Sequence, residues 1–158
     1  MPISGVKFTG PPITIEDIAQ LEKTLTVKLP GAYRDFLLQY NGGRPTPEDT
    51  FGVGNSGSLM SVFYAVKEDD PSHTIAHQRF VYEERIPSDL LPIAVDMGGS
   101  QVCMGIAPAN YGQIFFWAIY DEPRPEDKDQ HANIWKLADD FASFLETFRE
   151  EIDDDDDE

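Results

Sequence analysis

The apolar pattern of the first forty residues predicts two consecutive helices. Thr14 with Asp17 three residues later resembles a capping box, in which side chain and backbone exchange hydrogen bonds at a helix start. Pro30 fits the first turn of a second helix, and Asn41-Gly42-Gly43 ends it, because glycine adopts the left-handed backbone conformation at little steric cost. Apolar residues recur at helical spacing after each start: Ile15, Ile18, Leu21 and Leu25, then Tyr33, Phe36, Leu37 and Tyr40.

The middle of the chain is predicted to contain a loop, a helix and several strands. Residues 44–57 are rich in Gly, Pro, Thr, Ser and Asn, and we expect a long loop there. A strand is predicted over 58–66 and a helix over 73–84. The sequence of residues 91–106 indicates a hairpin whose turn lies at 97–100, and a strongly apolar strand follows at 114–119. Consecutive antiparallel strands are therefore expected at the centre of the fold.

The chain ends in a predicted amphipathic helix and an acidic tail. The helix is expected over 138–152, with Phe141, Phe144, Leu145 and Phe148 on one face. Like charges repel each other and oppose the helix dipole at its C-terminal end, so residues 153–158 are expected to be disordered. The 158 residues fit one domain over 1–152. Together the patterns predict an α+β fold with a mostly antiparallel central sheet flanked by helices, two N-terminal and one long C-terminal.

The net charge limits the kinds of partner. Twelve Lys and Arg face 29 Asp and Glu, which gives a formal net charge of -17. A surface this negative repels nucleic acid and anionic lipid, so we expect neither as a partner, and a basic protein fits better. The sequence shows no membrane-spanning apolar run and no signal-peptide pattern, and Cys103 has no second cysteine to pair with. A cytoplasmic location is expected.

No constellation of residues indicates catalysis or a bound cofactor. Cys103 lies in a predicted strand, where a buried core residue is a better interpretation than a nucleophile. His73 and His77 have the spacing to share a metal, but the sequence fixes no third ligand, and we expect a solvated helix face and no metal. The glycines of 52–57 lack the Lys of a phosphate-binding loop. We expect no cofactor and no enzymatic activity, and a hydrolase is the weakest of three hypotheses.

Two further features have a structural and a functional interpretation. Asp96 precedes Gly98-Gly99, and capping of the turn amides is favoured over a catalytic carboxylate. Trp117 is assigned to the core in preference to an interface, whereas Tyr120 and Trp135 are residues of the kind that often anchor protein interfaces.

Four short strings form a recognisable pattern: 18–43 (with Leu-Pro, Tyr, Phe-Leu and Asn-Gly-Gly), 91–103 (strand, Asp, Gly-Gly and Cys), 112–117 (a strand ending in Trp) and 141–145 (the closing helix). Together they resemble the SUKH superfamily, in particular the branch named after the yeast Smi/Knr cell-wall-assembly regulators. Ser100 departs from the more common Asn of this pattern. The resemblance extends from about residue 12 to 150.

The resemblance implies an α+β fold and a non-enzymatic role. Bacterial members are commonly immunity proteins that bind and neutralise a toxin, often a nuclease, while fungal relatives are regulators. We therefore expect a basic toxin domain as partner, with a scaffold or regulatory role as the alternative; the oligomeric state stays open. Separately from the resemblance, and with no motif to mark it, we expect a binding face of acidic and aromatic residues around the 44–57 segment, with this candidate partner-binding set: Asp69, Asp70, Tyr120, Asp121 and Glu122.

Overall fold

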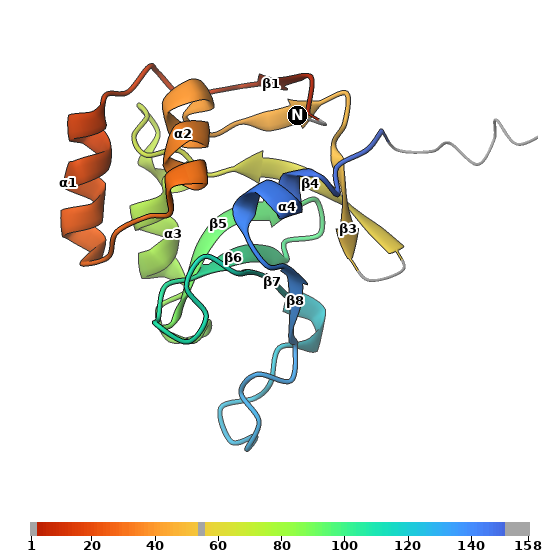
Figure 1. The fold of residues 1–158 in the computed structure, drawn as a ribbon. Coiled ribbons are helices and arrows are strands. Elements are labelled where there is room, and N and C mark those ends of the chain that lie inside the picture. Colours follow the sequence, from red (N-terminus) through yellow and green to blue (C-terminus); the bar gives the residue numbers. More distant parts are fainter. Residues whose placement is uncertain (1–2, 54–55, 151–158) are drawn as a thin grey trace, which may run out of the picture.

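The computed structural model describes residues 3–53 and 56–150 (Figure 1). The helices are α1 (Ile15–Leu25), α2 (Gly31–Tyr40), α3 (Ile75–Val81) and α4 (Phe141–Leu145), with 3₁₀ turns η1 (Pro71–His73) and η2 (Ile119–Asp121). The strands are β1 (Gly5–Lys7), β2 (Arg44–Thr46), β3 (Thr50–Val53), β4 (Ser56–Phe63), β5 (Leu90–Asp96), β6 (Gln101–Gly105), β7 (Ile114–Trp117) and β8 (Ile134–Ala138).

The strands form one large antiparallel sheet and one small one. The large sheet has the order β3-β4-β5-β6-β7-β8, so each strand pairs with the next along the chain, and β1 pairs with β2 in a two-stranded sheet. The expected hairpin is β5 and β6, with Leu91 opposite Met104 and Val95 opposite Gln101. This arrangement confirms the α+β class and the mostly antiparallel sheet.

Aromatic side chains hold α2 and α4 against one face of the sheet. The ring centroid of Phe36 on α2 lies 4.8 Å from that of Phe63 on β4 and 5.1 Å from that of Phe141 on α4. Phe144 packs 5.6 Å from Phe51 of β3, so the core continues towards the sheet edge. Full burial of a side chain of this size stabilises the fold by about 1.5–3 kcal/mol. The apolar faces expected for these two helices therefore form the main core.

A smaller apolar cluster covers the opposite face of the sheet. Ile86, Leu90, Cys103 and Trp117 are buried together there. Side chains alternate along a strand, so Cys103 and Trp117 point away from the main core that contains Val102 and Phe116. The core assignment of Cys103 and of Trp117 is confirmed, and burial raises the pKa of the Cys103 thiol.

Two expectations about the elements are wrong. The segment 44–57 contains β2, β3 and the start of β4 where a long loop was expected, because β2 pairs with β1 and β3 pairs with β4. The helix expected over 138–152 starts later and ends at Leu145, since the chain then crosses the edge of β3. Thr50 and Arg149 exchange backbone hydrogen bonds of 3.0 and 2.8 Å, and Gly52 N donates to Thr147 Oγ1 at 3.1 Å. The expected disordered tail, 153–158, lies outside the described residues.

Candidate protein-binding surface

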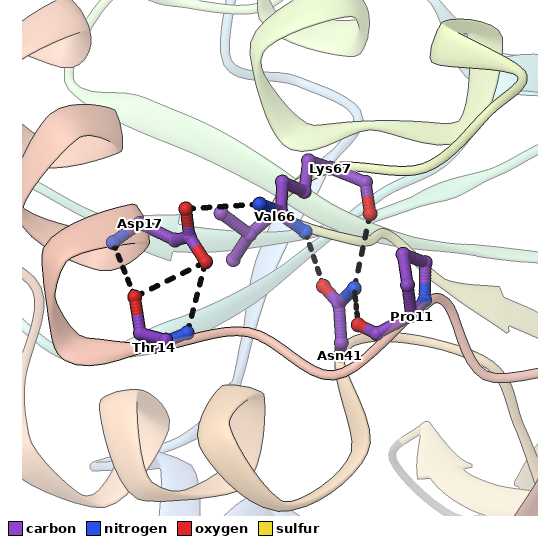
Figure 2. Close-up of polar contacts among 6 residues, drawn as sticks. All are labelled: Pro11, Thr14, Asp17, Asn41, Val66 and Lys67. Carbon is purple, nitrogen blue, oxygen red and sulfur yellow. Dashed lines mark hydrogen bonds and ion pairs between the residues drawn. The ribbon is translucent and has the colours of Figure 1, made fainter.

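Asn41 joins three separate segments at the end of α2 (Figure 2). Its Oδ1 accepts a hydrogen bond of 2.7 Å from Val66 N, after β4. Its Nδ2 donates to the carbonyl oxygens of Pro11 at 2.7 Å and of Lys67 at 3.0 Å. The residue is 2% exposed and has a φ of 44°, a left-handed conformation that Asn tolerates better than most residues. Asn41 thus fixes the segment before α1 against the segment after β4.

The start of α1 is attached to the same segment (Figure 2). Thr14 N donates to Asp17 Oδ2 at 2.9 Å and Asp17 N donates to Thr14 Oγ1 at 3.3 Å, which confirms the expected capping box. Lys67 Nζ forms an ion pair with Asp17 Oδ1 at 3.1 Å. The Thr14 backbone hydrogen bond and then Lys67 hold the pKa of Asp17 below its ordinary value.

The two glycines after Asn41 allow the backbones to approach closely. Gly42 has φ 83°, and a Cβ there would lie 2.8 Å from the carbonyl oxygen of Phe63. Gly43 has φ 110°, and a Cβ there would lie 2.5 Å from the carbonyl oxygen of Lys7. No larger residue fits either position without moving the backbone. The Asn-Gly-Gly string therefore brings β1 and β2 next to β4.

A cleft of about 350 Å³ lies where these segments meet. We call it the Phe8 cleft. Its apolar lining includes Val62 of β4, Val95 of β5, Met97 of the following turn, and Phe8 just after β1. Phe8 is 81% exposed and Met97 is 57% exposed. Large exposed apolar side chains gathered around a hollow are typical of a protein-binding surface.

The backbone of Phe8 is strained. Its φ is 59°, in the left-handed region that a bulky aromatic residue rarely occupies. Such a conformation costs on the order of 1–2 kcal/mol, and an 81% exposed side chain recovers little of that cost by packing within the chain. Strain of this kind gathers at functional sites, so Phe8 is a strong candidate for a partner contact.

Polar groups line the rest of the Phe8 cleft. Arg44 Nη2 forms an ion pair with Asp49 Oδ2 at 3.1 Å, and Arg44 Nη1 donates to Met97 Sδ at 3.8 Å. Glu68 and His73 also line the cleft, and Glu68 Oε1 lies 3.9 Å from His73 Nδ1. The lining of the cleft therefore combines apolar side chains with hydrogen-bonding groups, and both kinds of group occur in protein interfaces.

The structure places two of the five predicted site residues beside this cleft. Asp69 and Asp70 are exposed and lie between Glu68 and His73, which line it. Asp70 Oδ1 accepts a hydrogen bond from Ser72 N at 3.0 Å, and the Ser72 contacts lower the pKa of Asp70. These two residues are exposed as a partner contact requires.

The other three predicted residues lie elsewhere, in and after η2. Figure 1 shows η2, in cyan, well away from the yellow-green segment that precedes α3. Tyr120 is 83% exposed and approaches the turn after β5, since a Cβ on Gly98 would lie 3.5 Å from Tyr120 Cε2. Asp121 is exposed. The five predicted residues therefore form two separate groups, 69–70 and 120–122. Tyr120 brings the second group next to the turn that contains Met97.

Glu122 already has a partner within the chain. Arg85 Nε donates to Glu122 Oε2 at 2.9 Å and Arg85 Nη2 to Glu122 Oε1 at 2.7 Å, a two-pronged ion pair. The Arg85 guanidinium also lies 4.9 Å from the ring centroid of Tyr82 and 5.4 Å from that of Trp117. Glu122 therefore attaches the segment after η2 to the body, so it is a weaker candidate for partner contact than Asp121.

The other residues considered for catalysis or metal binding show no site of that kind in the described part of the chain. Asp96 Oδ1 accepts hydrogen bonds from Gly98 N at 3.0 Å and Ser100 N at 2.8 Å, which confirms the turn-capping interpretation. Within residues 3–53 and 56–150, no three His, Cys, Asp or Glu side chains are grouped to hold a metal ion. No helix in that same part of the chain has the length and apolar character to cross a membrane.

Sequence reasoning missed Phe8, Val62 and Met97. The signal for Met97 was present, because a large apolar residue stood in a turn beside Gly98-Gly99. Phe8 gave no signal, since its left-handed φ and its place in the cleft depend on the pairing of β1 with β2.

Comparison with known proteins identifies the family. Residues 12–147 match the SMI1 / KNR4 family (SUKH-1), and the chain belongs to this family. It is also similar to the SPbeta prophage-derived uncharacterized protein YokK of Bacillus subtilis (strain 168). The two are 29% identical over 150 residues, which cover 84% of this chain and 72% of the relative. The expected resemblance is confirmed over most of the chain.

Proposed function

We propose that this chain is an immunity protein that neutralises a cognate toxin by binding it directly in the cytoplasm. The observation that carries the proposal is Phe8, a strained and exposed aromatic residue beside an apolar cleft. Membership of the SMI1 / KNR4 family supports a binding role, and the similarity to a prophage-derived protein is consistent with it.

The charge of the chain supports a basic toxin, such as a nuclease. A nuclease needs a cationic surface to hold phosphate, and a protein of net charge -17 attracts such a surface over a distance of about a Debye length. This attraction raises mainly the association rate and the selectivity for basic partners. Affinity then comes from apolar contacts, for which Phe8 and Met97 are the candidates.

Inhibition in this proposal is occlusion without turnover. One chain covers the toxin's substrate-binding surface in a stable complex that buries about 800 Å² on each partner. No cofactor or metal takes part. The two acidic groups of the predicted site, Asp69-Asp70 and Asp121, contribute to attraction of the toxin without forming the centre of the contact.

The proposal is tested with purified nuclease toxin domains encoded beside genes for chains of this family. Each domain is incubated with the wild-type chain, and both nuclease activity and complex formation are measured. We expect one domain to form a complex and lose activity, and Phe8→Ala to weaken that complex at least tenfold, about 1.4 kcal/mol.

Phe80→Ala is the matched control, because Phe80 is also highly exposed but lies on α3, outside the Phe8 cleft. The control should leave binding unchanged. A complex that leaves the toxin fully active, or regulatory proteins as the only specific partners, would contradict the immunity function and favour a scaffold.

A further inference from the structure

A second hollow, of about 220 Å³, lies between α2 and α4. We call it the α2–α4 pocket. Its lining consists of one side of α2 (Ala32, Asp35, Phe36 and Gln39), three residues of α4 (Phe141, Ala142 and Leu145), and Glu146, which follows α4 directly. Figure 1 shows the two helices near each other over the sheet. None of these residues belongs to the Phe8 cleft.

The base of the α2–α4 pocket is aromatic. Phe36 and Phe141 meet edge to face with ring centroids 5.1 Å apart and an interplanar angle of 65°. Ala32 and Ala142 are exposed, and their small side chains leave the space above these rings unfilled. The hollow thus follows from two alanines placed beside two buried phenylalanines.

The walls of the α2–α4 pocket carry negative charge without an internal cation. Asp35 of α2 and Glu146, just after α4, line it, and neither forms an ion pair with any residue in the described part of the chain. Asp17, Asp49 and Glu122 are by comparison paired with Lys67, Arg44 and Arg85, whereas exposed acids such as Glu84 and Glu126 are, like Asp35 and Glu146, without an ion pair in the described chain. The pocket therefore has two carboxylates available to an external cation.

We infer that the α2–α4 pocket receives one arginine or lysine side chain of a basic partner. The aliphatic stem of that side chain lies on the phenyl rings, and its charge lies between the two carboxylates. The size agrees, because a hollow of about 220 Å³ has room for one long side chain. The inference rests on the proposed function, which supplies the basic partner.

The test uses a short peptide that contains one arginine and a control peptide with citrulline in its place. Citrulline keeps the length and shape of arginine but lacks its charge. The methyl signals of Ala32 and Ala142 are followed by NMR during titration at low salt. We expect the arginine peptide to shift both signals and the citrulline peptide to bind at least tenfold more weakly, about 1.4 kcal/mol.

Substitutions in the α2–α4 pocket distinguish the contribution of its charge to peptide binding from that of its shape. Asp35→Asn with Glu146→Gln should reduce arginine-peptide binding about tenfold. Glu84→Gln with Glu126→Gln, two exposed residues with no ion pair in the described chain, removes the same charge elsewhere and should change it less than twofold. Ala32→Leu fills the hollow without altering charge and should abolish the shift of the Ala142 methyl signal, which is the reporter that this variant keeps.

The results distinguish the inference about the α2–α4 pocket from the proposed immunity function. Equal binding of both peptides, methyl signals that do not move, or an equal loss in the Glu84 and Glu126 variant overturns the inference. These measurements use no toxin, so a failure here leaves the immunity function standing. Conversely, arginine-peptide binding at the pocket together with full toxin activity in the presence of the chain would overturn the immunity function alone.

Discussion

Replacement of Asn41 by Ala and by Gly separates its hydrogen bonds from its backbone conformation. Either change removes the partner of Val66 N and of the carbonyl oxygens of Pro11 and Lys67. Three lost hydrogen bonds at about 1 kcal/mol each lower the free energy of unfolding by about 3 kcal/mol. Alanine also retains the cost of a positive φ, which adds about 1 kcal/mol, whereas glycine does not.

We therefore expect Asn41→Ala to lose about 4 kcal/mol and Asn41→Gly about 3 kcal/mol. Urea denaturation followed by tryptophan fluorescence measures both. Gln20→Ala on α1 is the control, since that exposed amide forms no such set of bonds and its loss should stay within about 0.5 kcal/mol. A loss below about 1 kcal/mol for Asn41→Ala, or a glycine variant less stable than the alanine variant, would refute the reasoning.

Three other predictions concern Phe8, Asp17 and Cys103. Phe8→Gly should be about 1 kcal/mol more stable than Phe8→Ala by urea denaturation, because Gly relieves the positive φ; an ordinary φ would reverse the order. The lowered pKa of Asp17 contributes stability above pH 3.8 that is lost as pH falls through its folded value, so the advantage of wild type over Asp17→Asn should shrink in acid; a constant difference from pH 6 to 2 would argue against this. Burial raises the pKa of the Cys103 thiol, so a thiol reagent at pH 8 should react with it only after unfolding. Rapid labelling of the native chain would contradict the buried position of Cys103.

The sequence predicted those elements whose signals are local. The capping box at Thr14 and the glycines after Asn41 place the ends of α1 and α2 correctly, because caps depend on a few neighbouring residues. The turn between β5 and β6 was predictable for the same reason, through Asp96 and the glycines that follow it. The aromatic face of the closing helix was also recognised, since Phe141 and Phe144 are buried as expected.

Elements that depend on distant partners were not predictable. The strand β8 was missed, because Ile134–Ala138 pairs with β7 after a long polar segment and has weak alternation of its own. Phe148 stands at helical spacing from Phe144, so the sequence predicted a longer closing helix. In the structure α4 ends at Leu145, because the chain that follows pairs with β3 through Arg149 and Thr50. The Phe8 cleft has the same origin, since its parts come together only when β1, β2, β4 and β5 are assembled.

The central claim is that this chain binds and inactivates one basic toxin. The most direct measurement is a titration of nuclease activity, in which a fixed amount of toxin domain receives increasing amounts of the chain at low and at moderate salt. We expect activity to fall linearly to zero at one chain per toxin, with slower association at moderate salt because ions screen the -17 charge. Full nuclease activity at a large excess of the chain, for every toxin domain that binds it, would contradict the claim.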